Sequence, residues 1–320
     1  MENGGIIDAI CYGMVVCDVA ISELERALMS PSSVTTADMP SLERLLDGIF
    51  MEGVPGKMTA MFPQLFAEEN RENLWIYRDG SEVCAHAGML FRSVQIGGCL
   101  LPVACVGAVA TASSWRGKGL ASELMDILWK RACASGAVIM MISGDRSLYR
   151  RLGAAAVGVA YEAVVSIPDA EAFRQGEGRL RPADVSDLSA MNLLYTAKKN
   201  RFLRIPSDWR LHFDSPLRVS GERRFYILEK EVSMAGYFIV SMERKEHAPA
   251  EIIEFAGDAA LLVGALARLM EAVSRNALTI RLEEEDVYMR ERLSSSGVAL
   301  QRVSVQGSWA VLHWPRLIEA

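Results

Sequence analysis

Val109-Ala110-Thr111-Ala112-Ser113-Ser114-Trp115-Arg116-Gly117-Lys118-Gly119-Leu120-Ala121 connects two segments with different hydrophobic patterns. The segment before it, Leu100 to Val109, is almost continuously apolar and predicts a buried strand. The segment after it carries leucine or isoleucine at positions 120, 124, 127 and 128, a spacing that predicts an amphipathic helix. The first turn of a helix offers unpaired N–H groups and the positive end of the helix dipole. Because glycines and basic residues occupy this turn, the stretch predicts an anion-binding loop.

The same region predicts a β-α-β unit with this loop at its first turn. The helix is expected to end at Gly136, and Ala137 to Ile142 predicts the next strand. The Walker pattern fits poorly, because Ala112 stands at its first glycine and Gly119 at its hydroxyl residue. The Rossmann fingerprint also fails, because its glycines have a different spacing. A turn shaped by glycines without a ligand is the alternative left open.

Two motifs carry a resemblance to a known family. Arg116-x-x-Gly119-x-Ala121 after a strand resembles motif A of the GNAT superfamily of N-acetyltransferases. Further along, Leu148-Tyr149-Arg150-Arg151-Leu152-Gly153 resembles the LYxxxG segment of the same superfamily. Two motifs in the family's order are more specific than either motif alone. The sequence departs from the family at Ile142, where an asparagine is often found.

The resemblance implies an acetyl-CoA site and a direct mechanism. The loop would bind the pyrophosphate, and the backbone of the preceding strand would pair with the pantetheine arm. The amine would attack the thioester directly in a ternary complex, with Tyr149 as the acid for the leaving thiolate. A tyrosine that only packs at a helix start is the alternative for Tyr149. The implied cofactor-binding residues are Val109, Thr111, Arg116, Gly117, Lys118, Gly119, Leu120 and Ala121.

The base that accepts the amine's proton is less well marked. Glu68, Glu69 and Glu72 precede the first predicted hairpin, where acceptor loops usually run in the family, but they also fit a solvated helix face. His86 lies within an apolar strand, where a core histidine is the simpler interpretation. Asp145 could orient the loop before Tyr149 or cap its helix.

The chain as a whole predicts two tandem GNAT-like α/β (α+β) domains. Each domain is expected to have a mixed, mostly antiparallel sheet flanked by helices. Residues 33–168 are expected to form the domain that the resemblance implies would bind acetyl-CoA, with helices over 36–49 and 58–68 and a closing strand at 157–166. Residues 169–178 read as a linker, and 179–320 as a second, degenerate domain. That domain carries Ala256-Gly257-Asp258 at the loop position, and its aspartate would repel a pyrophosphate.

Residues 1–32 are expected to form an N-terminal extension, helical over much of its length. Asp8 and Asp18 interrupt its apolar run, and no basic segment precedes it, so neither a secretory signal nor a membrane span is expected. The run could pack on the body of the protein or on a second subunit, which leaves a homo-oligomer open. It could also be an upstream extension, because Met29 precedes the start of the family resemblance.

The composition of the chain limits the classes of partner and ligand that are expected. A net charge of −6 argues against a general nucleic-acid binder, which would show a basic stripe. The six cysteines show no CxxC pair and no histidine cluster, so no metal site is expected. The cysteines at positions 84, 99, 105 and 133 have apolar neighbours and are expected to be reduced core residues of a cytoplasmic protein.

The sequence therefore predicts an N-acetyltransferase that uses acetyl-CoA as cosubstrate and no metal. The acceptor is the amine of a small molecule or of a protein, and neither nucleic acid nor membrane is an expected partner. The alternative is a catalytically silent protein that binds or senses acyl-CoA, or serves as an interaction module. A purely structural pair of domains is a third interpretation. The acceptor itself is not determined, because acceptor specificity lies in loops without a portable pattern.

Overall fold

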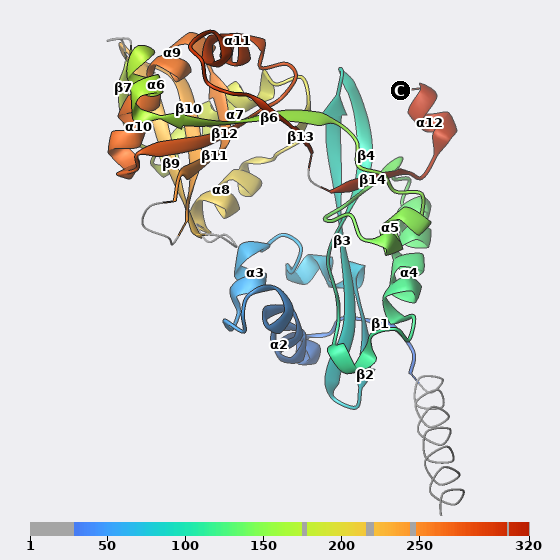
Figure 1. Ribbon diagram of the computed structural model, residues 1–320. Coiled ribbons are helices and arrows are strands. Elements are labelled where there is room, and N and C mark those ends of the chain that lie inside the picture. The colour runs from blue at the N-terminus through green and yellow to red at the C-terminus, as the bar shows by residue number, and fades with distance from the viewer. Residues whose placement is uncertain (1–28, 175–177, 216–220, 244–247, 306, 320) are drawn as a thin grey trace, which may run out of the picture.

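The computed structural model describes residues 29–174, 178–215, 221–243, 248–305 and 307–319. Most of the expected extension, residues 1–28, lies outside this part of the chain. Over the described residues the strands form two mixed sheets of seven strands each. Helices cover both faces of each sheet (Figure 1), so the predicted fold class is confirmed.

The first sheet contains the predicted β-α-β unit. Its order is β1-β2-β3-β4-β5-β14, and β8 pairs with β3. All the pairs are antiparallel except β4 with β5, which is parallel. Its elements before residue 152 are β1 (Ser32–Ser33), the 3₁₀ helix Thr36–Asp38, α2 (Met39–Phe50), α3 (Lys57–Met61), the 3₁₀ helix Glu68–Asn73, β2 (Leu74–Asp79), β3 (Glu82–Ile96), β4 (Cys99–Thr111), the 3₁₀ helix Ser113–Trp115, α4 (Leu120–Ala134), β5 (Ile139–Ile142) and α5 (Ser147–Arg151).

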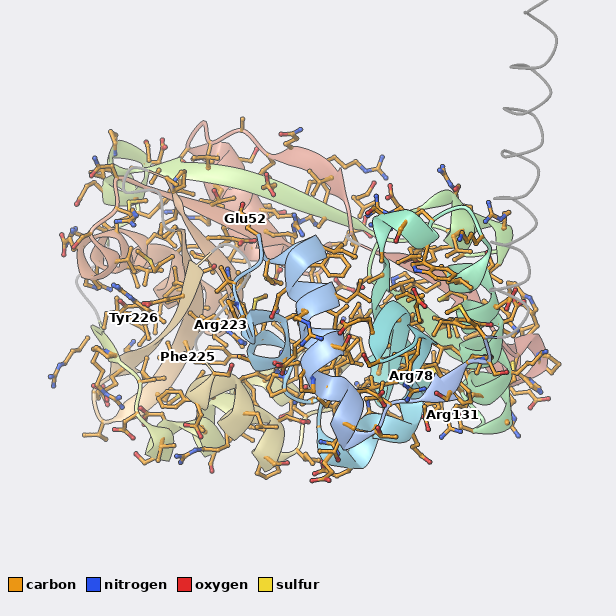
Figure 2. The ribbon with its side chains drawn as sticks, turned by 90° about the horizontal axis from the view of Figure 1, so that it is seen from below. Glu52, Arg78, Arg131, Arg223, Phe225 and Tyr226 are labelled. Atoms are coloured by element: carbon orange, nitrogen blue, oxygen red, sulfur yellow. The ribbon has the colours of Figure 1, made fainter. Side chains whose placement is uncertain are left out.

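Two apolar clusters hold this sheet between its helices. Leu120, Leu124 and Leu128 of α4 are almost fully buried against one face. Leu42 and Leu46 of α2 are fully buried against the other face. Figure 1 shows α4 and α5 on one side of the long β3–β4 hairpin and α2 and α3 on the other. In Figure 2, α2 lies between the labelled side chains of β9 in the second sheet and Arg131 of α4.

The second sheet repeats much of this arrangement. Its order is β13-β6-β12-β11-β10-β9-β7, with β11 and β12 as its parallel pair. The remaining elements are β6 (Val159–Ser166), α6 (Ile167–Ala172), β7 (Arg179–Pro182), the 3₁₀ helix Val185–Asp187, α7 (Leu188–Thr196), β8 (Arg201–Phe202), α8 (Pro206–Asp214), β9 (Gly221–Lys230), β10 (Ser233–Glu243), β11 (Ala250–Gly257), α9 (Ala259–Gly264), α10 (Leu266–Val273), β12 (Ala277–Leu282), α11 (Val287–Ser295), β13 (Gln301–Ser304), β14 (Ser308–Val311) and α12 (Trp314–Glu319).

The two sheets exchange strands, which the sequence did not predict. The strand expected at 157–166 forms as β6, but it pairs with β12 and β13 of the second sheet rather than closing the first. The first sheet is completed instead by β14, which pairs antiparallel with β5. The crossing segments meet at the isolated bridge between Ala155 and Trp309. An apolar strand can bury its side chains in either sheet, so its own pattern cannot select the partner.

Two smaller expectations are also corrected. The helix expected at 58–68 ends at Met61, because Pro63 has no N–H to continue it, and a 3₁₀ helix follows at Glu68–Asn73. Residues 169–172 of the expected linker belong to the helix α6, which begins in a capping box between Ser166 and Asp169. Ala170 of this helix is fully buried in the core of the second sheet, so 167–172 is part of the packed structure.

The chain has two units, each built around one of the two sheets, and polar contacts at α8 join them. The buried Asp208 accepts a hydrogen bond from Gln64 at 2.7 Å and an ion-pair contact from Arg92 at 3.1 Å. Its second oxygen accepts from the N–H of Ile205 and so caps α8. This carboxylate therefore fixes a helix of the second unit against the first unit.

The described cysteines are free and differ in burial. Cys84 is buried, Cys99 and Cys105 are partly buried, and Cys133 is exposed on α4, so the expectation of a core residue is wrong for Cys133. No helix within the described residues is long and apolar enough to cross a membrane.

Because the two sheets exchange strands, we predict that the first unit cannot fold alone when the chain is cut at residue 168, the domain boundary expected from the sequence. A fragment of residues 29–168 would lose β14 and leave β5 with an open edge, while β6 would lose its sheet. We expect aggregation and no cooperative thermal transition by size-exclusion chromatography and circular dichroism. A control chain that joins 29–157 to 305–319 restores β14 and should be more soluble. A monomeric 29–168 fragment with a cooperative transition would contradict this.

Candidate active site

The candidate site lies where β4 and β5 separate. Their parallel pairing ends at the pair Val106–Ile142. Beyond that pair, the end of β4, the start of α4 and the helix α5 enclose a cavity of about 350 Å³. The cavity is lined by Ile49, Val109, Ala110, Thr111, Trp115, Arg116, Gly117, Gly119, Leu120, Ala121, Ser122, Arg146, Ser147, Leu148, Tyr149 and Arg151.

The predicted loop takes its shape from its glycines. Gly117 and Gly119 have φ of +80° and +83°, in the left-handed region that favours glycine. Gly119 is the N-cap of α4, and no side chain in the described part of the chain caps this helix. The first turn of α4 contributes Leu120, Ala121 and Ser122 to the cavity wall, and no side chain among the described residues caps its N–H groups.

The two basic residues of the loop lie differently. Arg116 lines the cavity, and its Nε donates to the carbonyl oxygen of Thr111 at 3.2 Å, which ties the loop to the end of β4. The ammonium of Lys118 lies 4.1 Å from the ring centre of Trp115, and Lys118 is not among the residues that line the cavity. The structure thus brings together all the predicted cofactor-binding residues except Lys118.

Tyr149 also lines the cavity, from α5. It is 2% exposed, and burial raises the pKa of its phenol above the ordinary value of 10, an effect that the charge of Arg146 partly offsets. The phenol therefore keeps its proton at neutral pH. A residue in this place can donate a proton to a leaving group in the cavity.

Sequence reasoning missed further basic residues of the cavity. Arg146 and Arg151 flank Tyr149 and line the same space as Arg116. The signal was present, because Arg146 and Arg151 lie within three residues of Tyr149 in and next to the LYxxxG segment. Together the guanidinium groups of Arg116, Arg146 and Arg151 make the cavity strongly cationic.

None of the candidate bases lies on the cavity wall. Glu68 pairs with Arg71, and Glu72 pairs with Arg131, on exposed surface. Glu69 and Asp145 are exposed and do not line the cavity. His86 is fully buried, as the core interpretation predicted, and burial lowers its pKa to about 4.

The second sheet has a cavity at the corresponding place, with different chemistry. It measures about 540 Å³ and lies between the end of β11, the start of α9 and α11. Here Asp258 caps α9, because its carboxylate accepts from the N–H groups of Ala260 and Leu261 at 2.9 and 3.0 Å. The predicted aspartate therefore occupies the helix start that an anion would need. The charged residues that line this second cavity are Lys198, Lys199, Glu283, Glu285 and Asp286.

Within the described residues, no group of three or more His, Cys, Asp or Glu side chains is arranged to hold a metal ion.

Comparison with known proteins gives a family match for the first part of the chain. Residues 30–157 match the sequence model of a family described as the acetyltransferase (GNAT) domain, so this part of the chain belongs to the GNAT superfamily. No curated protein sequence matches the chain. The fold of nearly the whole chain is similar to that of GCN5-related N-acetyltransferases of known structure. The protein from Anabaena variabilis ATCC 29413 has a TM-score of 0.74 at 15% identity, over 91% of this chain and 75% of that one.

Two further structures extend this similarity. A GCN5-related N-acetyltransferase from Kribbella flavida has a TM-score of 0.69 at 18% identity, over 90% of this chain and 73% of that one. The N-myristoyltransferase of Saccharomyces cerevisiae with bound myristoyl-CoA has a TM-score of 0.56 at 9% identity, over 88% of this chain and 81% of that one. Family membership supports an acyltransferase that uses acyl-CoA and an amine acceptor.

The left-handed backbone at Gly119 gives a prediction that does not depend on function. Replacing Gly119 by Ala places a Cβ at φ +83° and should lower the free energy of unfolding by about 1 kcal/mol in urea titrations. Gly119→Asn should have a smaller effect, because asparagine tolerates this region. The control is Gly48→Ala within α2, where a Cβ meets nothing within 4 Å and should stabilise the helix. Equal effects at Gly119 and Gly48 would be inconsistent with this explanation.

Proposed function

We propose that this protein transfers an acetyl group from acetyl-CoA to an amine, with one active site per chain, in the first unit. The observation that carries the proposal is the shared cavity. It joins the end of β4, the uncapped start of α4 and Tyr149 on α5, which is the set of elements that the resemblance assigns to acetyl-CoA. The second cavity does not offer an equivalent anion site, because Asp258 occupies the N–H groups at its helix start.

The charges of the first cavity fit a cosubstrate with several phosphate groups. The start of α4 supplies free N–H groups and the positive end of a dipole. Arg116, Arg146 and Arg151 supply guanidinium groups that can bind phosphate through paired hydrogen bonds. Among the described residues that line this cavity, none is Asp or Glu, so no carboxylate opposes an anion there.

The proposed reaction forms a C–N bond and breaks a C–S bond. Bound amine and thioester are held together, and backbone N–H groups at the end of β4 polarise the thioester carbonyl. The amine nitrogen attacks the carbonyl carbon, and the coenzyme A thiolate leaves. Tyr149 gives its proton to this thiolate, while the proton of the amine passes to water. Because the pKa of Tyr149 is raised, its acid form persists across neutral and mildly alkaline pH.

A short acyl group fits the surroundings better than a long one. Ala108 and Ala110, beside the cavity, pack directly into a cluster beneath α2. Its members Leu42, Leu46, Leu65 and Phe66 are between 0% and 8% exposed. This closed packing behind the end of β4 supports acetyl-CoA as the cosubstrate.

One observation favours a second candidate function, a catalytically silent protein that binds acyl-CoA. Among the described residues that line the cavity, none is Asp, Glu or His, so no side-chain base stands beside the place of reaction. In the first candidate function, water must therefore accept the amine's proton.

Measuring the binding of coenzyme A tests whether the cavity is the site of the cosubstrate. We expect calorimetry to show binding of coenzyme A to the intact chain, and Arg116→Ala to weaken it about 10-fold, because one charge-assisted phosphate contact is lost. The matched control is Arg150→Ala, since Arg150 is exposed and lies outside the cavity wall. Absence of coenzyme A binding would refute both candidate functions.

Release of free thiol from acetyl-CoA distinguishes the two candidates. The panel of acceptors should include a polyamine, an aminoglycoside, an amino-acid amide and a peptide with a free N-terminus. With the best amine, Tyr149→Phe should reduce turnover about 100-fold, because the leaving thiolate loses its proton donor. Tyr161→Phe is the control, as Tyr161 lies on β6 of the second sheet. Unchanged turnover in Tyr149→Phe would remove the acid role, and binding without thiol release from any amine would favour the silent protein.

A further inference from the structure

The end of β4 that lines the cavity begins with a β-bulge. Gly88 of β3 pairs with Gly107 of β4, but His86 pairs with Ala110, so one residue of β3 opposes Ala108 and Val109 together. Ala108 has φ +54°, in the left-handed region that is unfavourable for a residue with a Cβ. A non-glycine residue keeps this conformation only where its surroundings hold it.

The bulge determines on which face of the sheet the side chain of each later residue of β4 packs. Before it, Ala104 and Val106 pack in the cluster beneath α4. After it, Val109 packs in that cluster, while Ala108 and Ala110 pack beneath α2. Without the extra residue these positions would exchange faces, because side chains alternate along a strand. The bulge also follows directly after the last pair between β4 and β5, so it sets the backbone that lines the cavity.

One side chain contacts the bulge by a directed hydrogen bond. Nδ1 of His86 lies 2.7 Å from the carbonyl oxygen of Ala108. Since a carbonyl only accepts, Nδ1 carries the hydrogen and donates it. The ring is therefore the neutral Nδ1–H tautomer, consistent with its complete burial.

The ring of His86 is closely surrounded in the core. A Cβ at Gly88 would lie 3.1 Å from Cε1 of the ring, so glycine at this position leaves the space that the ring occupies. Phe66 packs beside it, with ring centres 6.1 Å apart. Nε2 is buried and has no hydrogen-bond partner among the described residues. A buried polar atom without a partner is unfavourable, so an apolar residue would serve a purely packing role better.

We propose that His86 is a positioning residue for acyl transfer, which holds the Ala108 bulge so that the end of β4 presents its backbone N–H groups to the thioester carbonyl. The proposal rests on the proposed function of the cavity. His86 does not line the cavity and acts through Ala108. A small displacement of the reacting atoms is enough to reduce turnover strongly.

Two substitutions separate the hydrogen bond from packing. In His86→Asn the side-chain N–H₂ can take the place of Nδ1–H, whereas His86→Leu retains bulk but has no donor. We expect His86→Leu to lower kcat for thiol release from acetyl-CoA about 100-fold, with the dissociation constant of coenzyme A within threefold of the unsubstituted chain. His86→Asn should recover most of kcat. If the two variants have the same kcat, or His86→Leu has the kcat of the unsubstituted chain, the proposal is wrong.

A matched control accounts for general loss of stability. Trp209→Phe removes another buried hydrogen bond, from Nε1 of Trp209 to Asn192 at 2.7 Å, in the second unit. It should lower the melting temperature without lowering kcat. A loss of kcat in Trp209→Phe equal to that in His86→Leu would assign the effect to stability and overturn the proposal.

Two further measurements do not depend on turnover. Nitrogen-15 spectra of the unsubstituted chain should show a neutral Nδ1–H histidine signal that disappears in His86→Asn. If the signal that His86→Asn removes has the Nε2–H pattern instead, the proposal is wrong. A crystal structure of His86→Leu should show Ala108 outside the left-handed region, and an unchanged bulge would overturn it. If the unsubstituted chain neither binds coenzyme A nor releases thiol, the proposed function fails, while these two measurements still decide whether His86 holds the bulge.

Discussion

The parallel pairing of β4 and β5 runs from Val103–Ile139 to Val106–Ile142 and then stops, and the rest of the candidate site depends on that limit. Two parallel neighbours carry their carboxyl ends to the same edge of a sheet, so the loops that follow them meet there. One loop leads into α4 and the other into α5. Because the strands separate beyond this point, the end of β4 keeps backbone groups that no strand satisfies, and a cavity opens between the two helix starts.

The exchange of strands links this site to the end of the chain. β5 is short, and its buried residues would lie at an open edge if β14 did not pair with it. In return, β6 joins the core of the second sheet, where Ala163 and Val165 are buried. The two units are therefore not independent bodies joined by a linker. The contacts of Asp208 with Gln64 and Arg92 add a polar connection between the two units.

The two units place cavities at corresponding positions but give them different chemistry. In the first unit glycine begins the helix, and guanidinium groups line the space. In the second unit an aspartate satisfies the N–H groups of the helix start, and carboxylates contribute to the wall. A single residue at the N-cap thus decides whether a helix start can accept an anion or is already occupied.

The sequence by itself determined the local structure and much of the candidate site. Glycines at 117, 119 and 136, the apolar runs of β4 and β5 and the periodicity of α4 act between near neighbours, and for that reason they could be read from the chain. The predicted residues at 109, 111, 116 and 149 accordingly meet in one cavity.

Only the tertiary structure decided which sheet takes each closing strand, because an apolar strand can satisfy either core. It also decided that Lys118 lies over Trp115 while Arg146 and Arg151 join the cavity, since the direction of a long side chain depends on what surrounds it. The bulge at Ala108 and its contact with His86 depend on the register between β3 and β4. Register is a property of two strands together, and neither strand specifies it alone.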